Sequence, residues 1–160
     1  MEHRIGNMSK GLIRAIEQKN WYEIERLVRL GGDLNAPCDP FRNTPFLYAM
    51  SVFKKAEEIE QLIKLGGDLA YQNRRGETAM MLAIDNGCEA ITPWVMVDYG
   101  ADINVQDAWG NTALMRALLG KNIKQKKKLI FALIDYEADL TNLKNKEQKR
   151  AFDLLWDKLK

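Results

Sequence analysis

The chain has 160 residues, of which 46% are hydrophobic and 29% charged, and its formal net charge is +2. This balance is typical of a globular domain, and the longest apolar run, residues 129–134, is too short to cross a bilayer. The N-terminal residues lack the apolar core of a secretory signal, and Cys38 and Cys88 fit free thiols in a reducing compartment. We therefore expect a cytoplasmic protein without a membrane segment.

Charge is distributed unevenly along the chain. Residues 76–115 contain six acidic residues and no Lys or Arg, whereas residues 116–160 contain twelve basic and six acidic ones. In a linear arrangement of modules, segregation along the sequence becomes segregation in space. The basic run at 124–128 leaves open contact with nucleic acid or with an acidic protein, but it has no interleaved aromatic residues and matches no nucleic-acid module. The solvated start of a helix is the favoured interpretation of this run.

The first pair of helices is predicted within residues 6–38. Apolar residues at helical spacing include Leu12 and Ile16 in the first helix, and Ile24 and Val28 in the second. The segment closes with Gly32-Asp-Leu-Asn35, a phrase that returns three more times along the chain.

A second phrase opens each of the following units. Thr44, Thr78 and Thr112 stand 34 residues apart within the segments DPFRNTPFLYA, NRRGETAMMLA and DAWGNTALMRA. The closing phrase recurs around Asp33, Asp68, Asp102 and Asp139. A period in this range indicates stacked supersecondary units.

The unit that opens at Asn73 shows the expected order of elements. Asn73–Gly76 predicts a turn, Thr78 an N-cap and Gly87 a left-handed C-cap. Thr92 and Pro93 predict a second cap and first turn, which start another short helix. Helices this short are unstable in isolation, so each unit must bury its apolar face against its neighbours.

The last part of the chain departs from this period. Asp102 and Asp139 are separated by 37 residues, and the extra residues fall around 120–128, where we expect a longer loop between the two helices. Residues 145–155 match the opening phrase again, with Arg150 at the Thr position, and predict a final half-unit.

The pattern resembles the ankyrin repeat, whose signature opens Asp-x-x-Gly-x-Thr-Pro-Leu-His-x-Ala and closes Gly-Ala-Asp-x-Asn. The resemblance implies an all-α solenoid of about four helix-turn-helix repeats plus a C-terminal capping half-repeat, with β-hairpin-like fingers. It implies one domain over residues 1–160, with units of about 6–38, 39–72, 73–106 and 107–143 and a cap at 144–160.

Two departures from the signature have structural consequences. Leu47, Met81 and Met115 replace the signature His, which in the family hydrogen-bonds within and between repeats, so we expect apolar packing in its place. Arg42 replaces the turn Gly, so we expect a strained or altered turn there.

Catalysis is not expected. The only histidine is His3, the two cysteines are 50 residues apart, and no Gly-rich phosphate loop is present. We therefore assign no catalytic, cofactor-binding or metal-binding residue, and no small-molecule substrate.

The resemblance implies a protein–protein interaction module that binds through its concave face and finger tips, as an adaptor, scaffold or inhibitor. The alternatives are an immunity protein that blocks a toxin or enzyme, a secreted effector that acts on a host protein, and nucleic-acid binding through the basic C-terminal third. We expect a monomer when free.

Trp21, Trp94 and Trp156 are expected to be structural, whereas Phe41 and Trp109 fit interface anchors, although packing against the next finger remains open. The family's contact positions correspond to Pro40, Phe41, Asn43, Ser51, Val52, Arg74, Arg75, Glu77, Asp85, Asn86, Ala108, Trp109, Asn111 and Leu119.

Overall fold

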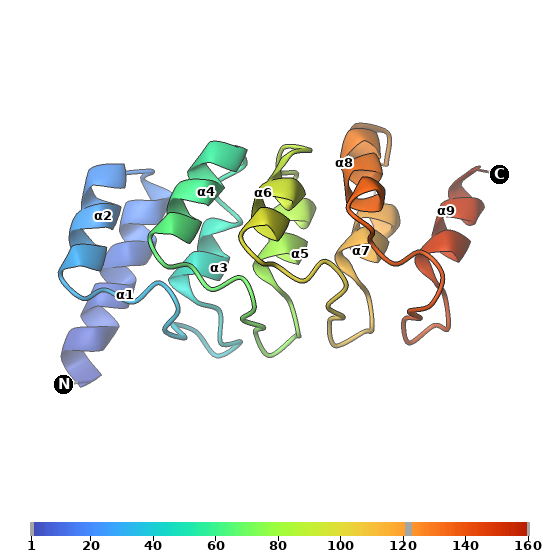
Figure 1. Ribbon diagram of the computed structural model, residues 1–160. Helices are drawn as coiled ribbons and strands as arrows, with labels where there is room; N and C mark the ends of the chain where they lie inside the picture. The colour runs from blue at the N-terminus through green and yellow to red at the C-terminus, as the bar shows by residue number, and fades with distance from the viewer. Residues whose placement is uncertain (1, 121–122, 160) are drawn as a thin grey trace.

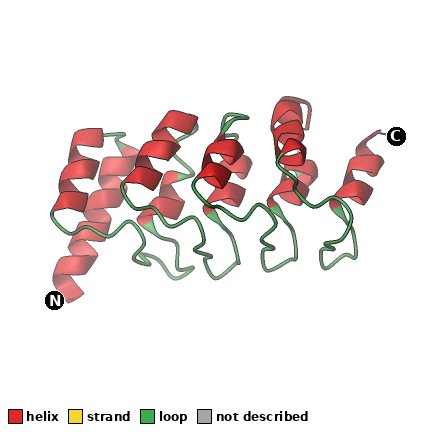
Figure 2. Ribbon diagram, viewed as in Figure 1, coloured by secondary structure: helices red, strands yellow, loops and turns green. Residues whose placement is uncertain are grey.

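The computed structural model describes residues 2–120 and 123–159 (Figure 1). These residues form nine α-helices and no strand (Figure 2). The helices are α1 (Glu2–Glu17), α2 (Trp21–Arg29), α3 (Pro45–Ala49), α4 (Ala56–Lys64), α5 (Ala79–Asp85), α6 (Thr92–Asp98), α7 (Ala113–Leu119), α8 (Ile123–Asp135) and α9 (Ala151–Leu159).

The helices stand side by side in two rows. The inner row contains α1, α3, α5, α7 and α9, each in contact with the next. The outer row contains α2, α4, α6 and α8, and of these α4 contacts α6 and α6 contacts α8 (Figure 1). The loops that join one pair to the next hang from one edge of the array. The chain therefore has an all-α repeat fold.

One hydrophobic core runs through the described part of the chain between the two rows. The inner helices provide much of it, because side chains from both of their faces meet neighbouring pairs. Leu47, Met81 and Met115, at the position of the signature His, are at most 1% exposed. This confirms that apolar packing replaces the expected hydrogen bonds at that position.

The recurring threonines cap the inner helices, as predicted for Thr78. The Thr44 hydroxyl accepts a hydrogen bond from the backbone N–H of Leu47 at 3.1 Å. Thr78 and Thr112 accept equivalent bonds from Met81 at 3.4 Å and Met115 at 3.3 Å. Each bond satisfies a backbone donor that the first turn of a helix leaves unpaired.

The prediction that Thr92 caps α6 is wrong. Ile91 is the cap residue and makes no side-chain cap hydrogen bond, while Thr92 is already in the helix. The backbone N–H of Thr92 donates to the Glu89 carbonyl at 3.0 Å, which starts the helical geometry one residue early.

The prediction of a longer loop in the fourth unit is also wrong. Because Lys and Gln favour helices, the extra residues lengthen α8 to 13 residues, against 9 in α4 and 7 in α6.

Each hanging loop, here called a finger, is folded around one Asn or Asp side chain. Asn73 accepts hydrogen bonds from the backbone N–H groups of Arg75 and Glu77, at 2.9 and 3.0 Å. Asp107 does the same for Trp109 and Asn111, at 2.8 and 2.9 Å. The fingers are thus turns held by side-chain acceptors.

A residue with positive φ follows in each turn. Gly76 and Gly110 have φ of 70° and 78°, and the corresponding Arg42 has φ of 59°. The expectation of strain at Arg42 is confirmed, because an L residue with a side chain rarely adopts this conformation.

Candidate functional site

The finger tips form a continuous series because adjacent tips are joined through their backbones. The N–H of Arg74 donates to the Phe41 carbonyl at 2.9 Å, and the N–H of Ala108 donates to the Arg75 carbonyl at 2.8 Å. The N–H of Lys146 donates to the Trp109 carbonyl, also at 2.8 Å. The side chains at the tips are therefore held at regular intervals along one edge of the array.

Two of these tip side chains are large and exposed. Phe41 is 49% exposed and Trp109 is 50% exposed. The Arg75 guanidinium lies 4.5 Å from the centroid of the Phe41 ring, which places a cation over one face of that ring. Phe41 is therefore partly packed against the next finger, while half of its surface remains available.

A hollow of about 440 Å³ lies beside these tips, between the fingers that carry Arg75 and Trp109 and the ends of α5 and α7. We call it the Arg116 hollow. Its lining includes six of the predicted contact residues, which are Arg75, Glu77, Asp85, Trp109, Asn111 and Leu119, and also Asp107, Arg116 and Gly120.

Arg116 lines this hollow and pairs with three carboxylates. Its Nη2 donates to Glu77 at 3.0 Å and also to Asp85, its Nε donates to Asp85 at 3.0 Å, and its Nη1 donates to Asp107 at 3.3 Å. The Arg116 side chain is 15% exposed, against 9% for Glu77, 39% for Asp85 and 2% for Asp107.

This network joins two successive pairs of helices. Burial disfavours the charged guanidinium, but hydrogen bonds and attraction from Asp85 and Glu77 outweigh burial and raise the pKa of Arg116 above its ordinary value. Arg116 therefore stays charged and fixes the fingers that carry Arg75 and Trp109 relative to each other.

Several of the predicted contact residues have a structural role, because their side chains hydrogen-bond to neighbouring residues of the array. Glu77 is buried and bonded to Arg116 and to Asn73, whose amide donates to it at 2.8 Å. Asn43 and Asn111 accept hydrogen bonds from the side-chain amides of Asn73 and Asn145, at 2.8 and 3.0 Å. Glu77, Asn43 and Asn111 therefore support the surface through hydrogen bonds within the array.

The remaining predicted residues fall into two groups. Pro40, Arg74 and Ala108 are exposed on the fingers. Ser51, Val52 and Asn86 lie near the opposite ends of the helices: the Ser51 hydroxyl donates to the Tyr48 carbonyl at 2.7 Å, the Asn86 amide donates to the Met50 carbonyl at 3.0 Å, and Val52 packs against the core. The structure does not bring this second group to the finger tips.

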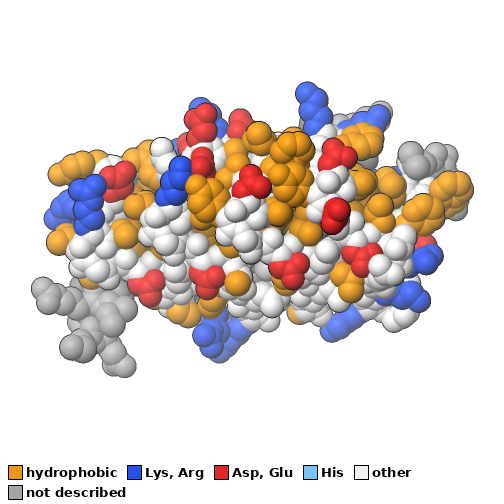
Figure 3. All heavy atoms as spheres, in the orientation of Figure 1, with side chains coloured by type: hydrophobic (Ala, Val, Ile, Leu, Met, Phe, Trp, Pro, Cys, Tyr) orange, Lys and Arg blue, Asp and Glu red, His pale blue; other side chains and the backbone are white. Residues whose placement is uncertain are grey.

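Another exposed apolar surface lies on the outer row. Figure 3 shows hydrophobic side chains gathered over α6, where Ile91 is 53% exposed and Trp94 is 37% exposed. Trp94 packs on Tyr136 at 4.9 Å between ring centroids and donates to the Ala132 carbonyl at 3.3 Å, as expected of a structural tryptophan. Trp156, also expected to be structural, is instead 54% exposed beside Phe152.

Comparison with known families bears directly on this architecture. A family model described as ankyrin repeats (3 copies) matches residues 12–107. The chain belongs to the ankyrin-repeat family. Ankyrin repeats are generally protein–protein interaction modules and are typically non-enzymatic. A search of the curated proteins found no match to this ankyrin chain.

Two further observations concern other kinds of site. Within residues 2–120 and 123–159, no helix of this ankyrin array is long and apolar enough to span a membrane. Over the same described ranges, no group of three or more His, Cys, Asp and Glu side chains is arranged to hold a metal ion.

Sequence reasoning missed Arg116, which organises the ankyrin surface. A signal was present, since Arg116 is the first basic residue after a stretch of 40 residues with six acidic side chains. An arginine or lysine that follows such an acidic stretch is a candidate partner for the carboxylates one repeat earlier when it lies on the packed side of an inner helix.

Proposed function

We propose that this chain is a non-enzymatic module that binds a partner protein through its finger tips and the Arg116 hollow. The observation that carries the proposal is the pair of half-exposed aromatic side chains, Phe41 and Trp109, on tips tied together by backbone hydrogen bonds. Large aromatic side chains on a rigid support lose little conformational entropy when a partner covers them, so they are frequent anchors of interfaces.

The contact surface combines these anchors with a polar surround. Arg75, Asp85 and Leu119 line the same hollow as Trp109, and all three are exposed. We propose four helix-pair repeats, the units at 6–38, 39–72, 73–106 and 107–143, as the array that presents this surface, with residues 144–160 as the cap. The cap covers the apolar side of α7 through α9.

We further propose that the module is monomeric when free and acts in the cytoplasm. Cys38 and Cys88 are both free thiols, which supports a reducing compartment. The specific roles that we consider are an adaptor, a scaffold and an inhibitor of a toxin or enzyme. An inhibitor would form a tight one-to-one complex with one enzyme, whereas a scaffold would bind several partners more weakly.

Affinity capture from the native cell, followed by titration of the purified partner, tests the proposal. The variant Phe41→Ala/Trp109→Ala is expected to weaken binding by about tenfold or more, with an unchanged melting temperature. The matched control is Tyr22→Ala/Phe131→Ala, since Tyr22 and Phe131 are 78% and 57% exposed but lie on the outer helices α2 and α8. Equal affinities for the two double variants would refute the finger-tip site.

Binding of nucleic acid through the basic C-terminal third is the second candidate function. It predicts that affinity for an oligonucleotide falls steeply as salt concentration rises. Protein capture that persists at moderate salt, with no oligonucleotide binding, would exclude it.

A further inference from the structure

A second hollow, of about 450 Å³, adjoins the Arg116 hollow at Asp85, which lines both. We call it the lysine hollow. It lies where the loops before α4 and α6 meet the first half of α8. Its lining residues are Lys54, Asp85, Asn86, Gly87, Cys88, Ala90, Lys126, Lys128 and Leu129.

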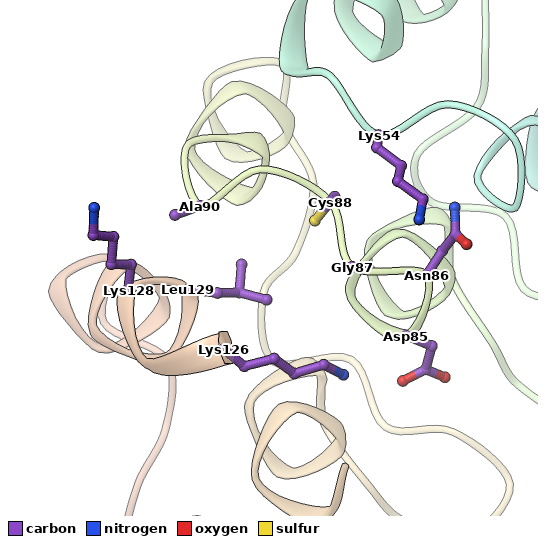
Figure 4. Close-up of a pocket in the computed structure, with 9 residues that line it drawn as sticks. All are labelled: Lys54, Asp85, Asn86, Gly87, Cys88, Ala90, Lys126, Lys128 and Leu129. Carbon is purple, nitrogen blue, oxygen red and sulfur yellow. The ribbon is translucent and has the colours of Figure 1, made fainter. Parts of the chain in front are cut away.

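On the described lining of this hollow, positive charge exceeds negative charge. Three lysines line it against one carboxylate, Asp85, which is already bonded to Arg116. None of the three lysines forms an ion pair with another described residue. Figure 4 shows the ammonium groups of Lys54 and Lys126 on the side nearest Asp85 and Asn86, while Lys128 points away. The two ammonium groups of Lys54 and Lys126 on one side of a concavity favour the entry of an anion.

The rest of the wall is neutral and partly apolar. Leu129 is 3% exposed and Cys88 is 8% exposed, and Ala90 lies beside them. Burial raises the pKa of the Cys88 thiol to about 11, so the thiol stays uncharged at neutral pH. An anionic group with an apolar stem therefore fits this wall better than a fully hydrated ion.

The hollow exists because the fourth unit departs from the repeat period. The extra residues lengthen α8 and bring Lys126 and Lys128 beside the loop of the preceding repeat. Among the residues that the structure describes, the lining has no aromatic side chain on which a nucleotide base could stack. A polypeptide is therefore favoured over a nucleic acid as the occupant.

We propose that the lysine hollow binds an acidic segment of the partner protein, with a Glu or Asp carboxylate between Lys54 and Lys126 and its apolar stem against Leu129. This inference rests on the proposed function, since the same partner contacts the finger tips. Because Asp85 borders both hollows, one partner surface can fill the two together.

The test uses a short labelled peptide of alternating Glu and Leu, titrated against the full chain by fluorescence anisotropy and by amide NMR shifts. Saturable binding with shifts at Cys88, Ala90 and Leu129 is expected. Lys54→Glu/Lys126→Glu is expected to weaken it by about tenfold. The matched control, Lys10→Glu/Lys127→Glu, makes the same change in net charge at exposed positions outside the hollow and is expected to change binding less than about twofold.

The inference is overturned by a lack of saturable binding of the Glu-Leu peptide, by equal weakening in the control variant, or by equally tight binding of a Gln-Leu peptide. If charge reversal lowers the melting temperature, Lys54→Gln/Lys126→Gln replaces it in the same comparison. Preference for a single-stranded DNA oligonucleotide over the peptide would also count against it. A purified partner that loses affinity for the Phe41→Ala/Trp109→Ala chain but not for the lysine variants would refute this inference alone.

Discussion

Arg116 on α7 donates to the Glu77 carboxylate at 3.0 Å, across 39 residues of sequence and from one repeat to the preceding one. Glu77 is buried, so its charge needs this partner. The pair links the stability of the array to the position of the fingers that carry Arg75 and Trp109.

Replacement of Arg116 by Ala is expected to lower the free energy of unfolding by about 3 kcal/mol, because it leaves Glu77 and Asp107 buried without a counter-charge. Chemical denaturation measures the change. The control Arg26→Ala breaks an exposed pair with Glu23 and should cost less than about 1 kcal/mol. Equal losses in the two variants would show that the Arg116 network contributes no more than a surface ion pair.

Replacement of Gly76 by Ala is expected to destabilise the fold more than replacement of Gly31 by Ala. Both glycines have positive φ, at 70° and 92°, so both substitutions carry the left-handed cost of about 1–2 kcal/mol. A Cβ on Gly76 would also lie 2.8 Å from the backbone nitrogen of Ala108, whereas a Cβ on Gly31 meets no atom within 4 Å. The difference between their melting temperatures measures how closely the fingers pack, and identical values would contradict that packing.

Replacement of Arg42 by Gly is expected to stabilise the chain by about 0.5 kcal/mol. Relief of the left-handed conformation gains about 1–2 kcal/mol, and the added freedom of glycine in the unfolded chain removes about 0.4–1 kcal/mol of that gain. The melting temperature of Arg42→Gly, compared with that of the control Arg74→Gly, shows whether the substitution stabilises the chain. Arg74 has no positive φ to relieve. A stabilised Arg74→Gly together with a destabilised Arg42→Gly would reverse this interpretation.

Alkaline pH is expected to destabilise the fold through Cys88. Burial raises the pKa of its thiol from 9.0 to about 11, so between these values the unfolded chain releases a proton that the folded chain retains. Unfolding is then favoured as pH rises, and the free energy of unfolding should fall by about 2 kcal/mol over that window, with no effect below pH 9. Urea titrations at several pH values, compared with Cys88→Ala, isolate this contribution. Parallel pH profiles for the two chains would show that Cys88 ionises normally in the folded state.

The fold could be predicted from the sequence because its signals are local. Thr44, Thr78 and Thr112 repeat a capping bond that spans only three residues, and the spacing between them gives the period. The burial of Leu47 and Met81 followed from their place in that period. Thr92 was misassigned because a threonine before a proline fits both a cap and a first helical residue, and the Glu89 hydrogen bond decides between them.

The surface was less predictable because its contacts join different repeats. Arg116 reaches Asp85 and Glu77 across 31 and 39 residues, and only the stacking distance between repeats brings those groups together. From the sequence alone Glu77 resembles an exposed turn residue, because nothing near it in the sequence indicates its contact with Arg116. The lysines of α8 were visible as a basic run, but whether that run formed a loop or a helix determined where Lys126 lies.

If a partner binds the finger tips as proposed, the backbone bonds between the tips also determine how it must fit. The Phe41, Arg75 and Trp109 carbonyls are each already bonded to the following finger, so the side chains around them have a set separation that one finger cannot adjust alone. Any adaptation on contact therefore falls to the incoming molecule, and a flexible one loses more entropy than one that already matches the spacing. We therefore expect the array to favour partners whose contact groups already match the spacing of the fingers, in addition to their chemistry.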